Sequence, residues 1–486
     1  MMASLDLPPL PESWVWMRLE EVLGFVKGKK PKNLGAKSEH LTIPYINIKA
    51  FEKEVFNQFT DGDGCPLCKA DDILIVWDGA RCGLVGKGVT GAIGSTLAKV
   101  DYYDLNSSYL FYFLQTQYDY INKRPRGVGI PHVDPSIFWN INFPLPSLSE
   151  QHRIVAKIEE LFTKLDAGVE ELKKVKAQLK RYRQAVLKHA IEGKLTEEWR
   201  KSHKGEIEPA SVLLKRIKKE RQKNAKGKFK ELPPLNTSNL PQLPEGWVWT
   251  RVWEISEMIQ YGTSEKAGDD SSGVPVLRMG NIQDGKLVFE DLKYFPKKWP
   301  QLNKFILQDG DVLFNRTNSA ELVGKTAIYK NHHPMAVFAS YLIRVRVNVN
   351  AYIPDMLPFF INSFYGRKYI ASVVSQQVGQ ANVNGTKLSL MPIPLPPLPE
   401  HHKIMEEIEK RFSAADEVEK AVGQSLKRAE RLRQSILKRA FEGKLVPQDP
   451  TEEPASVLLE RIKEEKTAEK KTKKGKSKEY EQKRLI

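Results

Sequence analysis

Apolar residues recur every three or four positions over two long stretches of the chain, and this spacing predicts two amphipathic helices. In the first stretch the apolar series runs from Ile154 to Val186, with Gly168 as its one break. A thinner series with the same period runs from Ile404 to Ile436, displaced by 250 residues. Steps of three and four residues place these side chains along one seam of a helix, as in a coiled coil.

The signals at the ends of these stretches predict where the helices begin and end. Prolines at 144–146 predict irregular backbone before the first helix, and Ser149 is a suitable N-cap. Gly193 and Gly443 suit C-terminal caps. A helix of about 40 residues is about 60 Å long, far longer than a small domain needs. We expect the two helices to pack on each other, antiparallel; the alternative is that each folds back on its own globular domain.

Four sequence blocks occur twice, in the same order, about half a chain apart. Residues 10–16 return at 243–249, 144–152 at 394–402, 190–195 at 440–445 and 208–214 at 453–459. Between the blocks, 20–140 and 255–390 align only loosely, although both contain a strand-like run led by proline and an acidic turn before an apolar strand. The repeated blocks are thus similar in the two halves of the chain, whereas the sequences between them differ. This is expected of a scaffold that keeps its form while its recognition surface diverges, with relaxed drift after an old duplication as the alternative.

These patterns divide the chain into six expected segments of mixed α and β structure. Two similar globular domains of α+β or α/β class are joined by the two long helices, with pseudo-twofold symmetry. The expected bounds are 1–148 for the first domain, 149–196 for its helix, 197–242 for a linker with a short helix at 211–221, 243–398 for the second domain, 399–446 for the second helix, and 447–486 for a short helix and a disordered basic tail.

The net charge of +16 and pI of about 9.4 suggest an anionic partner. The charge is unevenly placed, because residues 200–230 carry a net +9 and 461–486 a net +6. The two globular stretches are close to neutral. They could bind nucleic acid only through one locally basic face, and a merely basic soluble protein is the alternative.

The three cysteines, Cys65, Cys68 and Cys82, are too few for a disulfide framework and fit a reducing compartment. The first pair has the spacing of a zinc knuckle, but no second close pair follows. No run approaches about 18 apolar residues, and the start lacks the pattern of a signal peptide. We therefore expect a soluble cytoplasmic protein without a metal site.

Catalytic motifs fail on inspection. The segment 319–326 is close to a phosphate-binding loop, but serine stands where the tight turn needs glycine. We find neither the tetrapeptide of amino-methyltransferases nor a glycine fingerprint for S-adenosylmethionine. Two rival functions stay open: a coiled-coil scaffold that does not touch DNA, and a nuclease built on scattered acids such as Asp71, Asp72 and Asp311.

Together the repeated blocks resemble the specificity subunits of type I restriction-modification systems over nearly the whole chain, to about residue 460. The most specific match is the run at 378–384 and 392–400 that leads into the second helix. The segments 310–316 and 322–327 also look like that family's target-recognition domains, whereas the first domain is less typical, with 91–95 its best match.

The resemblance implies a DNA-reading subunit without catalytic activity. Two target-recognition domains would sit at opposite ends of an antiparallel helix pair, each reading one half of a split site in double-stranded DNA. The helices would set the unread gap and dock two modification subunits that methylate adenine. Up to two restriction subunits would add translocase and nuclease activity. S-adenosylmethionine, ATP and magnesium are then expected in the partner subunits, with no cofactor in this chain.

Residue types suggest which side chains contact DNA. Arginine reads guanine, asparagine and glutamine read adenine, and lysine positions phosphates. The alternative for each single residue is a solvated or structural polar group. In the first domain we predict Lys27, Lys29, Lys30 and Lys32 for phosphates and Asn47, Lys49, Arg81, Arg124 and Arg126 for bases. In the second domain we predict Tyr261, Thr263, Arg278, Asn281, Asn315, Arg316, Asn318, Gln376, Gln377 and Gln380.

Overall fold

The computed structural model describes residues 7–127, 129–224, 232–377 and 380–468. The chain forms two compact units. The first comprises 1–172 and 424–486, and the second 173–423. Of the basic tail that the sequence predicts from Lys466 onward, residues 469–486 lie outside the described residues. None of the helices in the described ranges is long and apolar enough to cross a membrane.

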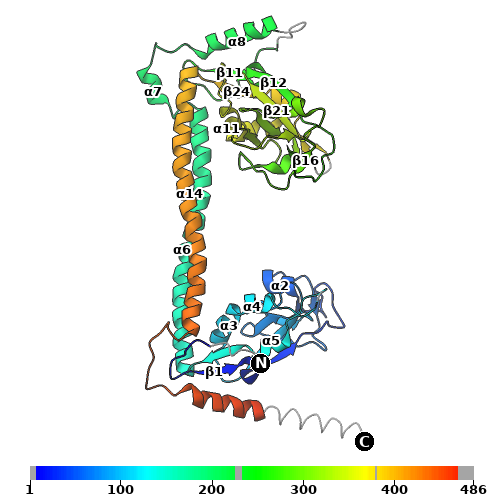
Figure 1. The fold of residues 1–486 in the computed structure, drawn as a ribbon, viewed down its shortest axis with the longest axis vertical. Helices are drawn as coiled ribbons and strands as arrows, with labels where there is room; N and C mark the ends of the chain where they lie inside the picture. The colour runs from blue at the N-terminus through cyan, green and yellow to red at the C-terminus, as the bar shows by residue number, and fades with distance from the viewer. Residues whose placement is uncertain (1–6, 128, 225–231, 378–379, 469–486) are drawn as a thin grey trace. The chain divides into compact units, whose positions relative to one another are not determined.

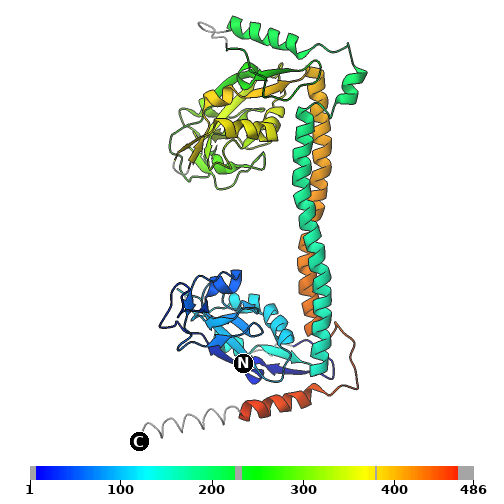
Figure 2. The same cartoon turned by 180° about the vertical axis from the view of Figure 1, so that it is seen from behind.

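Both long helices form. Helix α6 spans Leu148–Ile191 and α14 spans Leu398–Phe441, 44 residues each. In each unit a part of α6 lies beside a part of α14 (Figures 1 and 2). Ion pairs cross between the helices, from Arg433 to Asp166 in the first unit and from Arg183 to Asp416 and Glu419 in the second. The helices run antiparallel, as expected.

The seam between the helices is only partly enclosed. Ile154 and Ile158 are fully buried near the start of α6, and Ile404 and Ile408 near the start of α14. Later seam positions are mixed, because Val186, Val422 and Ile436 are buried while others lie open. Tyr182 and Val418 in the second unit and Leu432 in the first are exposed, and so is Gly168. The heptad pattern therefore overstates how much apolar surface two helices alone cover.

The starts of the long helices differ in detail from the expectation. Ser147, rather than Ser149, caps α6, because its hydroxyl accepts the N–H of Glu150 at 3.0 Å. Pro144 lies in a regular strand, β10 (Asn142–Leu145), and so do Pro392 and Pro394, in β24 (Pro392–Leu395), whereas Pro146 and Pro396 follow the strands. Strand β10 pairs with β1 (Val15–Arg18), and β24 pairs with β11 (Val248–Arg251), so each is an edge strand of a two-stranded ribbon. An edge strand tolerates a residue without an N–H, so the prolines do not prevent pairing.

The two globular domains share one sheet order. In the first, β2 (Leu23–Lys27), β9 (Leu97–Tyr102), β6 (Ile73–Val76) and β7 (Val85–Gly86) form an antiparallel sheet in the order β2-β9-β6-β7. In the second, β12 (Ser256–Tyr261), β21 (Leu342–Val347), β17 (Val312–Asn315) and β19 (Thr326–Ile328) lie in the order β12-β21-β17-β19. The sheets match strand for strand.

A second, smaller sheet in each domain also matches. Strand β3 (Ile43–Ile46) pairs in parallel with β8 (Gly91–Ile93), as β13 (Val274–Leu277) does with β20 (Val337–Phe338). Both β3 and β13 contain the expected proline, so this prediction is confirmed. The expected acidic turns precede β6 and β17. Their carboxylates, Asp72 and Asp311, each accept a backbone N–H three residues earlier in the chain.

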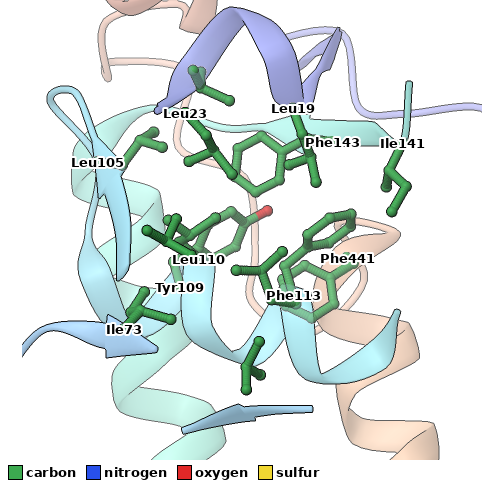
Figure 3. Packing of buried hydrophobic residues seen from close by; sticks show 14 of the residues in the cluster. Leu19, Leu23, Ile73, Leu105, Tyr109, Leu110, Phe113, Ile141, Phe143 and Phe441 are labelled. Carbon is green, nitrogen blue, oxygen red and sulfur yellow. The ribbon is translucent and has the colours of Figure 1, made fainter. Parts of the chain in front are cut away.

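Each domain packs a helical layer onto the long helices. In the first unit, α3 (Ser107–Thr116) places Tyr109 and Phe113 against Phe441 of α14, with ring centroids 5.2 and 5.3 Å apart. Figure 3 shows these rings beside Phe143 of β10. In the second unit, α11 (Met356–Asn362) and α12 (Phe364–Val373) belong to one core with the last turns of α6. Both domains therefore pack directly against the long helices.

The four repeated blocks meet at one junction in each unit. In the second unit the indole N–H of Trp247 donates to the buried Glu400 carboxylate at 2.7 Å. The same carboxylate accepts Thr196 and Arg200, which follow the end of α6. The amide of Ala210, the first residue of helix α8 (Ala210–Asn224), donates to the carbonyl of Gly246 at 2.9 Å. The expected linker helix is therefore present, and it docks on the second domain.

The first unit repeats this junction with the last segment of the chain. Trp14 donates to Glu150 at 2.8 Å, and Gln448 donates to the other oxygen of the same carboxylate at 2.6 Å. The amide of Ala455 donates to the carbonyl of Ser13 at 3.1 Å. Residues 455–468 are helical, in the place that α8 has in the second unit. The repeated blocks are thus explained as the contacts that join a domain to the helix ends.

Candidate nucleic-acid interface

A small three-stranded sheet gathers several predicted readers in the second domain. Strand β23 (Gln380–Asn382) pairs with β18 (Thr317–Asn318) on one side and β22 (Ser375–Gln377) on the other. Asn318 and Gln376 both pair with Ala381, while Gln377 pairs with Gln380 through the backbone. Gln376 and Gln380 are exposed, and Asn318 is half-buried. The side chain of Gln377 lies outside the described part. We call this sheet the amide sheet.

Tyr261 and Arg316 lie together beside the amide sheet. The Arg316 guanidinium stands 5.0 Å from the centre of the exposed Tyr261 ring and donates to the Ser340 carbonyl at 3.3 Å. The Tyr261 hydroxyl accepts the N–H of Gly385 at 2.6 Å. Backbone bonds hold Arg316 on both sides, to Tyr341 and Val383. The cation–π contact and these anchors fix the guanidinium near the sheet.

Lys387 joins this group and was missed by the sequence analysis. It lies on the short helix α13 (Gly385–Ser389), and its ammonium donates to the Ser375 hydroxyl of β22 at 2.6 Å. The Tyr369 hydroxyl donates to the Lys387 carbonyl at 2.7 Å, and burial raises the pKa of Tyr369 to about 12, which keeps it a donor. The capping residue Asn384, whose side chain accepts the Lys387 N–H, is the sequence signal that could have located this lysine.

Four predicted readers in the second domain are buried or bonded inside the domain. Thr263, Asn281 and Asn315 are buried, so their side chains do not face solvent. The Asn281 amide donates to the carbonyls of Val288 and Glu290 and accepts the Arg278 N–H. Arg278 itself is half-buried and donates to the carbonyl of Asp291. We therefore leave these four residues out of the proposed contact surface.

In the first domain a loop takes the place of the amide sheet. Arg126 and His132 exchange two backbone hydrogen bonds of 2.9 Å, and His132 also bridges to Asp78, the residue that follows Trp77 after β6. The Asp78 carboxylate contacts the His132 ring at 2.7 Å and the Lys27 ammonium at 2.9 Å. The exposed Arg124 and Arg126 therefore lie on a loop that is tied to the sheet.

The predicted phosphate contacts of the first domain lie beside this loop. Lys27 ends β2, and Lys29, Lys30 and Lys32 follow it, all exposed. Gly28 allows this turn, because a Cβ there would come within 2.2 Å of the Gly94 carbonyl oxygen. Gly262, after β12, is equally crowded by the Phe338 and Ala339 carbonyls. Lys27 thus holds the position that Tyr261 holds in the second domain.

The other predicted readers of the first domain are dispersed. Asn47 caps helix α2 (Ile48–Lys53), and its amide donates to Gln58 at 3.2 Å, so it has a structural role. Lys49 is exposed on that helix. Arg81 is exposed, with its guanidinium 3.4 Å from Glu52. Phe25, exposed on β2, stacks on Trp77 with centroids 4.8 Å apart, an aromatic surface that the sequence analysis missed.

Sites for metals or phosphate loops gain no support from the geometry. In the ranges that the structure describes, no three His, Cys, Asp or Glu side chains are placed to hold a metal ion. All three cysteines are free thiols. The segment 319–326 leads into strand β19 rather than into the helix that a phosphate-binding loop needs.

Comparisons with known proteins agree with this geometry. The family model described as "Type I restriction modification DNA specificity domain" matches twice, at residues 11–180 and 244–428. The specificity subunit of the type I restriction enzyme EcoKI from Escherichia coli strain K12 is 31% identical over 358 residues, which are 72% of this chain and 69% of that protein. The StySPI specificity subunit from Salmonella potsdam is 27% identical, over 94% of this chain and 96% of the relative.

A solved structure supports the fold. A chain from a study of complex assembly and conformational transition of the type I restriction-modification system matches with a TM-score of 0.58 and 19% identity, over 90% of this chain and 99% of that one. The two matches to the family model coincide with the two structural repeats, each a domain with part of its long helix. The chain therefore belongs to the specificity subunits of type I restriction enzymes, the components that recognise the DNA sequence.

Proposed function

We propose that each globular domain reads one half of a two-part site in double-stranded DNA, and that the chain carries out no chemistry on the DNA. One observation carries this proposal. The two domains present different side chains from the same place beside the main sheet, amides and an arginine in one and a basic loop in the other. A frame kept constant under a changing surface suits two independent readers of different sequences.

The contact surface we propose is smaller than the set predicted from the sequence. In the second domain it comprises Tyr261, Arg316, Asn318, Gln376, Gln380 and Lys387. In the first domain it comprises the lysines at 27, 29, 30 and 32 with Arg124 and Arg126. Lysine would hold the phosphates, amides would read base edges in the major groove, and arginine can do either. Gln377, Lys49 and Arg81 stay predicted DNA contacts that are not part of this proposed surface.

The long helices are proposed to dock two modification subunits and to set the gap between the half-sites. The open seam supports the first role, because Tyr182, Val418 and Leu432 are large apolar side chains exposed on a helix pair. Where such side chains form a contiguous patch, they mark a protein interface. S-adenosylmethionine, ATP and magnesium would then be bound by the modification and restriction subunits. If the chain were a scaffold that does not touch DNA, the divergence of the two surfaces would have no explanation.

A reconstitution experiment tests this division of labour. The purified chain is incubated with DNA, magnesium and labelled S-adenosylmethionine, with and without a type I modification subunit. We expect neither methyl transfer nor cleavage by the chain alone, and adenine methylation at one two-part sequence when the modification subunit is added. Methyl transfer or cleavage by the chain alone, or methylation without sequence preference in the complex, would contradict the proposal.

A further inference from the structure

The loop of the first domain, residues 124–127 and 129–132, is the structural counterpart of β22 and β23 in the second. The amide of Val133 donates to the carbonyl of Trp77, as that of Val383 donates to Arg316. A capping residue then follows in both, Asp134 before α5 (Pro135–Trp139) and Asn384 before α13. Each segment follows a helix, α4 (Tyr118–Asn122) in the first domain and α12 in the second, and returns to the main sheet at the residue after β6 or β17.

The counterparts differ in chemistry. Where β22 and β23 expose Gln376 and Gln380, the loop exposes Ile130, whose side chain is 61% open to solvent. Arg124 and Arg126 on the same loop are exposed as well, and the Arg124 guanidinium stands 4.3 Å from the Tyr120 ring centre. The loop of the first domain thus presents one large apolar side chain together with two cationic ones. The second domain carries amides at the matching position.

The backbone around Ile130 is held on both sides. The amide of Gly79 donates to the carbonyl of Pro131 at 2.7 Å, and His132 is bonded to Arg126 and Asp78. The proline after Ile130 restricts the backbone angles of Ile130 itself. Gly127 has φ +94°, and a Cβ there would come within 2.9 Å of the Ile130 carbonyl oxygen. Because these contacts hold described residues on both sides of Ile130, displaying its side chain costs little conformational entropy on binding.

In the major groove an isoleucine side chain can read a base in one way. It cannot hydrogen-bond, and the apolar group that base pairs display in the major groove is the C5 methyl of thymine. We propose that Ile130 contacts a thymine methyl group in the half-site read by the first domain, with Arg124 and Arg126 on the neighbouring phosphates. This inference rests on the proposed function, and it names a base that the first half-site must contain.

The test uses DNA in which single thymines are replaced by deoxyuridine, which pairs identically and lacks the methyl group. The full chain is assembled with a modification subunit, and its dissociation constant is measured for the mapped site with each thymine of the first half-site replaced in turn. A buried methyl group contributes roughly 0.8 kcal/mol, so we expect one replacement to weaken binding about fourfold. In the Ile130→Ala complex the same replacement should have no effect.

Two controls make the result specific. Val349→Ala removes a side chain that is 65% exposed in the second domain, away from the proposed surface, and should keep the fourfold difference. Thymine replacements in the second half-site should give equal ratios for the wild type and Ile130→Ala. Ile130→Val keeps one branch of the side chain and should retain part of the difference.

Three outcomes would overturn the inference: no replacement in the first half-site weakens wild-type binding, Ile130→Ala keeps the full difference, or Ile130→Ala weakens assembly with the modification subunit in the absence of DNA. The last would make Ile130 a protein contact. All three are distinct from failure of the proposed function, in which the wild-type complex would show no two-part site to begin with.

Discussion

His401 is a residue whose burial has a measurable consequence. It lies in the repeated block at 394–402, it is fully buried against Tyr352, and neither ring nitrogen has a hydrogen-bond partner in the described structure. Burial lowers its pKa from 6.5 to about 3. The unfolded chain therefore binds a proton at His401 below pH 6.5, whereas the folded chain does not until about pH 3. Acid thus favours unfolding at this residue.

Replacing this histidine should remove part of the acid sensitivity. The matched position in the first unit is Gln151, which is buried with its amide bonded to Asn106 and Pro146, so His401→Gln is a conservative change. Wild-type stability should fall relative to the variant by about 1.4 kcal/mol per pH unit below 6.5, or about 2 kcal/mol at pH 5. Urea denaturation between pH 5 and 7.5 measures it. His402→Gln, at an exposed position, is the control, and equal pH slopes for wild type and His401→Gln would contradict the account.

At the same scale, some contacts could be predicted from the sequence and others could not. The residue types of the amide sheet stood out because Gln376, Gln377 and Gln380 are neighbours in the chain. The contact of Arg316 with Tyr261, and of Tyr261 with Gly385, joins positions that are far apart in the sequence, and pattern alone does not reveal it. Asn281 and Asn315 look like readers by type, but only the folded backbone determines that they are buried.

At the scale of elements, the long helices were the strongest prediction because their signal is local and repeated. Helix α8, strand β3 and strand β13 were predicted for the same reason. Their ends were less predictable. The N-cap of α6 was predicted at Ser149, two residues too late, because Ser147 and Ser149 both carry a hydroxyl that could cap the helix. Prolines exclude a central strand but not an edge strand, so β10 and β24 were missed.

The glycines of the helices provide a matched stability test. Gly443 ends α14 with φ +68°, and a Cβ there would come within 2.3 Å of the Pro11 ring. Gly443→Ala should destabilise the chain by at least about 1–2 kcal/mol, the usual cost of a left-handed backbone at a residue with a Cβ. Gly168→Ala, inside α6 with open space around it, should instead stabilise the chain by about 0.5–1 kcal/mol. Urea titrations of both variants measure this difference, and effects of the same sign would refute the assigned roles.

At the scale of the whole molecule, the repeat explains the organisation of the chain. Each unit draws its junction from both halves of the sequence, because 443–455 completes the first unit and 193–210 completes the second. The order of the blocks in the sequence does not predict this exchange of segments between the two halves. The repeated blocks indicated where the conserved contacts lie, but only the hydrogen bonds of Glu150 and Glu400 show which copy of each block contacts which.

If the helices set the gap between half-sites, shortening both should shorten the gap. One heptad is about 10 Å of helix, or about three base pairs of DNA. Deleting residues 172–178 together with 422–428 keeps the seam in phase, whereas a three-residue deletion would break it. We expect a shorter preferred gap between unchanged half-sites, or loss of specific binding if the accompanying rotation cannot be absorbed. Methylation mapping of the genome in the deletion strain gives the answer, and an unchanged gap with full activity would show that the helices do not set the spacing.

The central claim is that the two domains read DNA independently, and exchanging one of them tests it most directly. Residues 20–140 are replaced by the corresponding region of a related specificity subunit, and methylated adenines are mapped across the genome with the same modification subunit. The account predicts that one half of the methylated motif changes to the half read by the donor domain, while the other half and the gap stay the same. A change in both halves, or a motif that does not change at all, would contradict it.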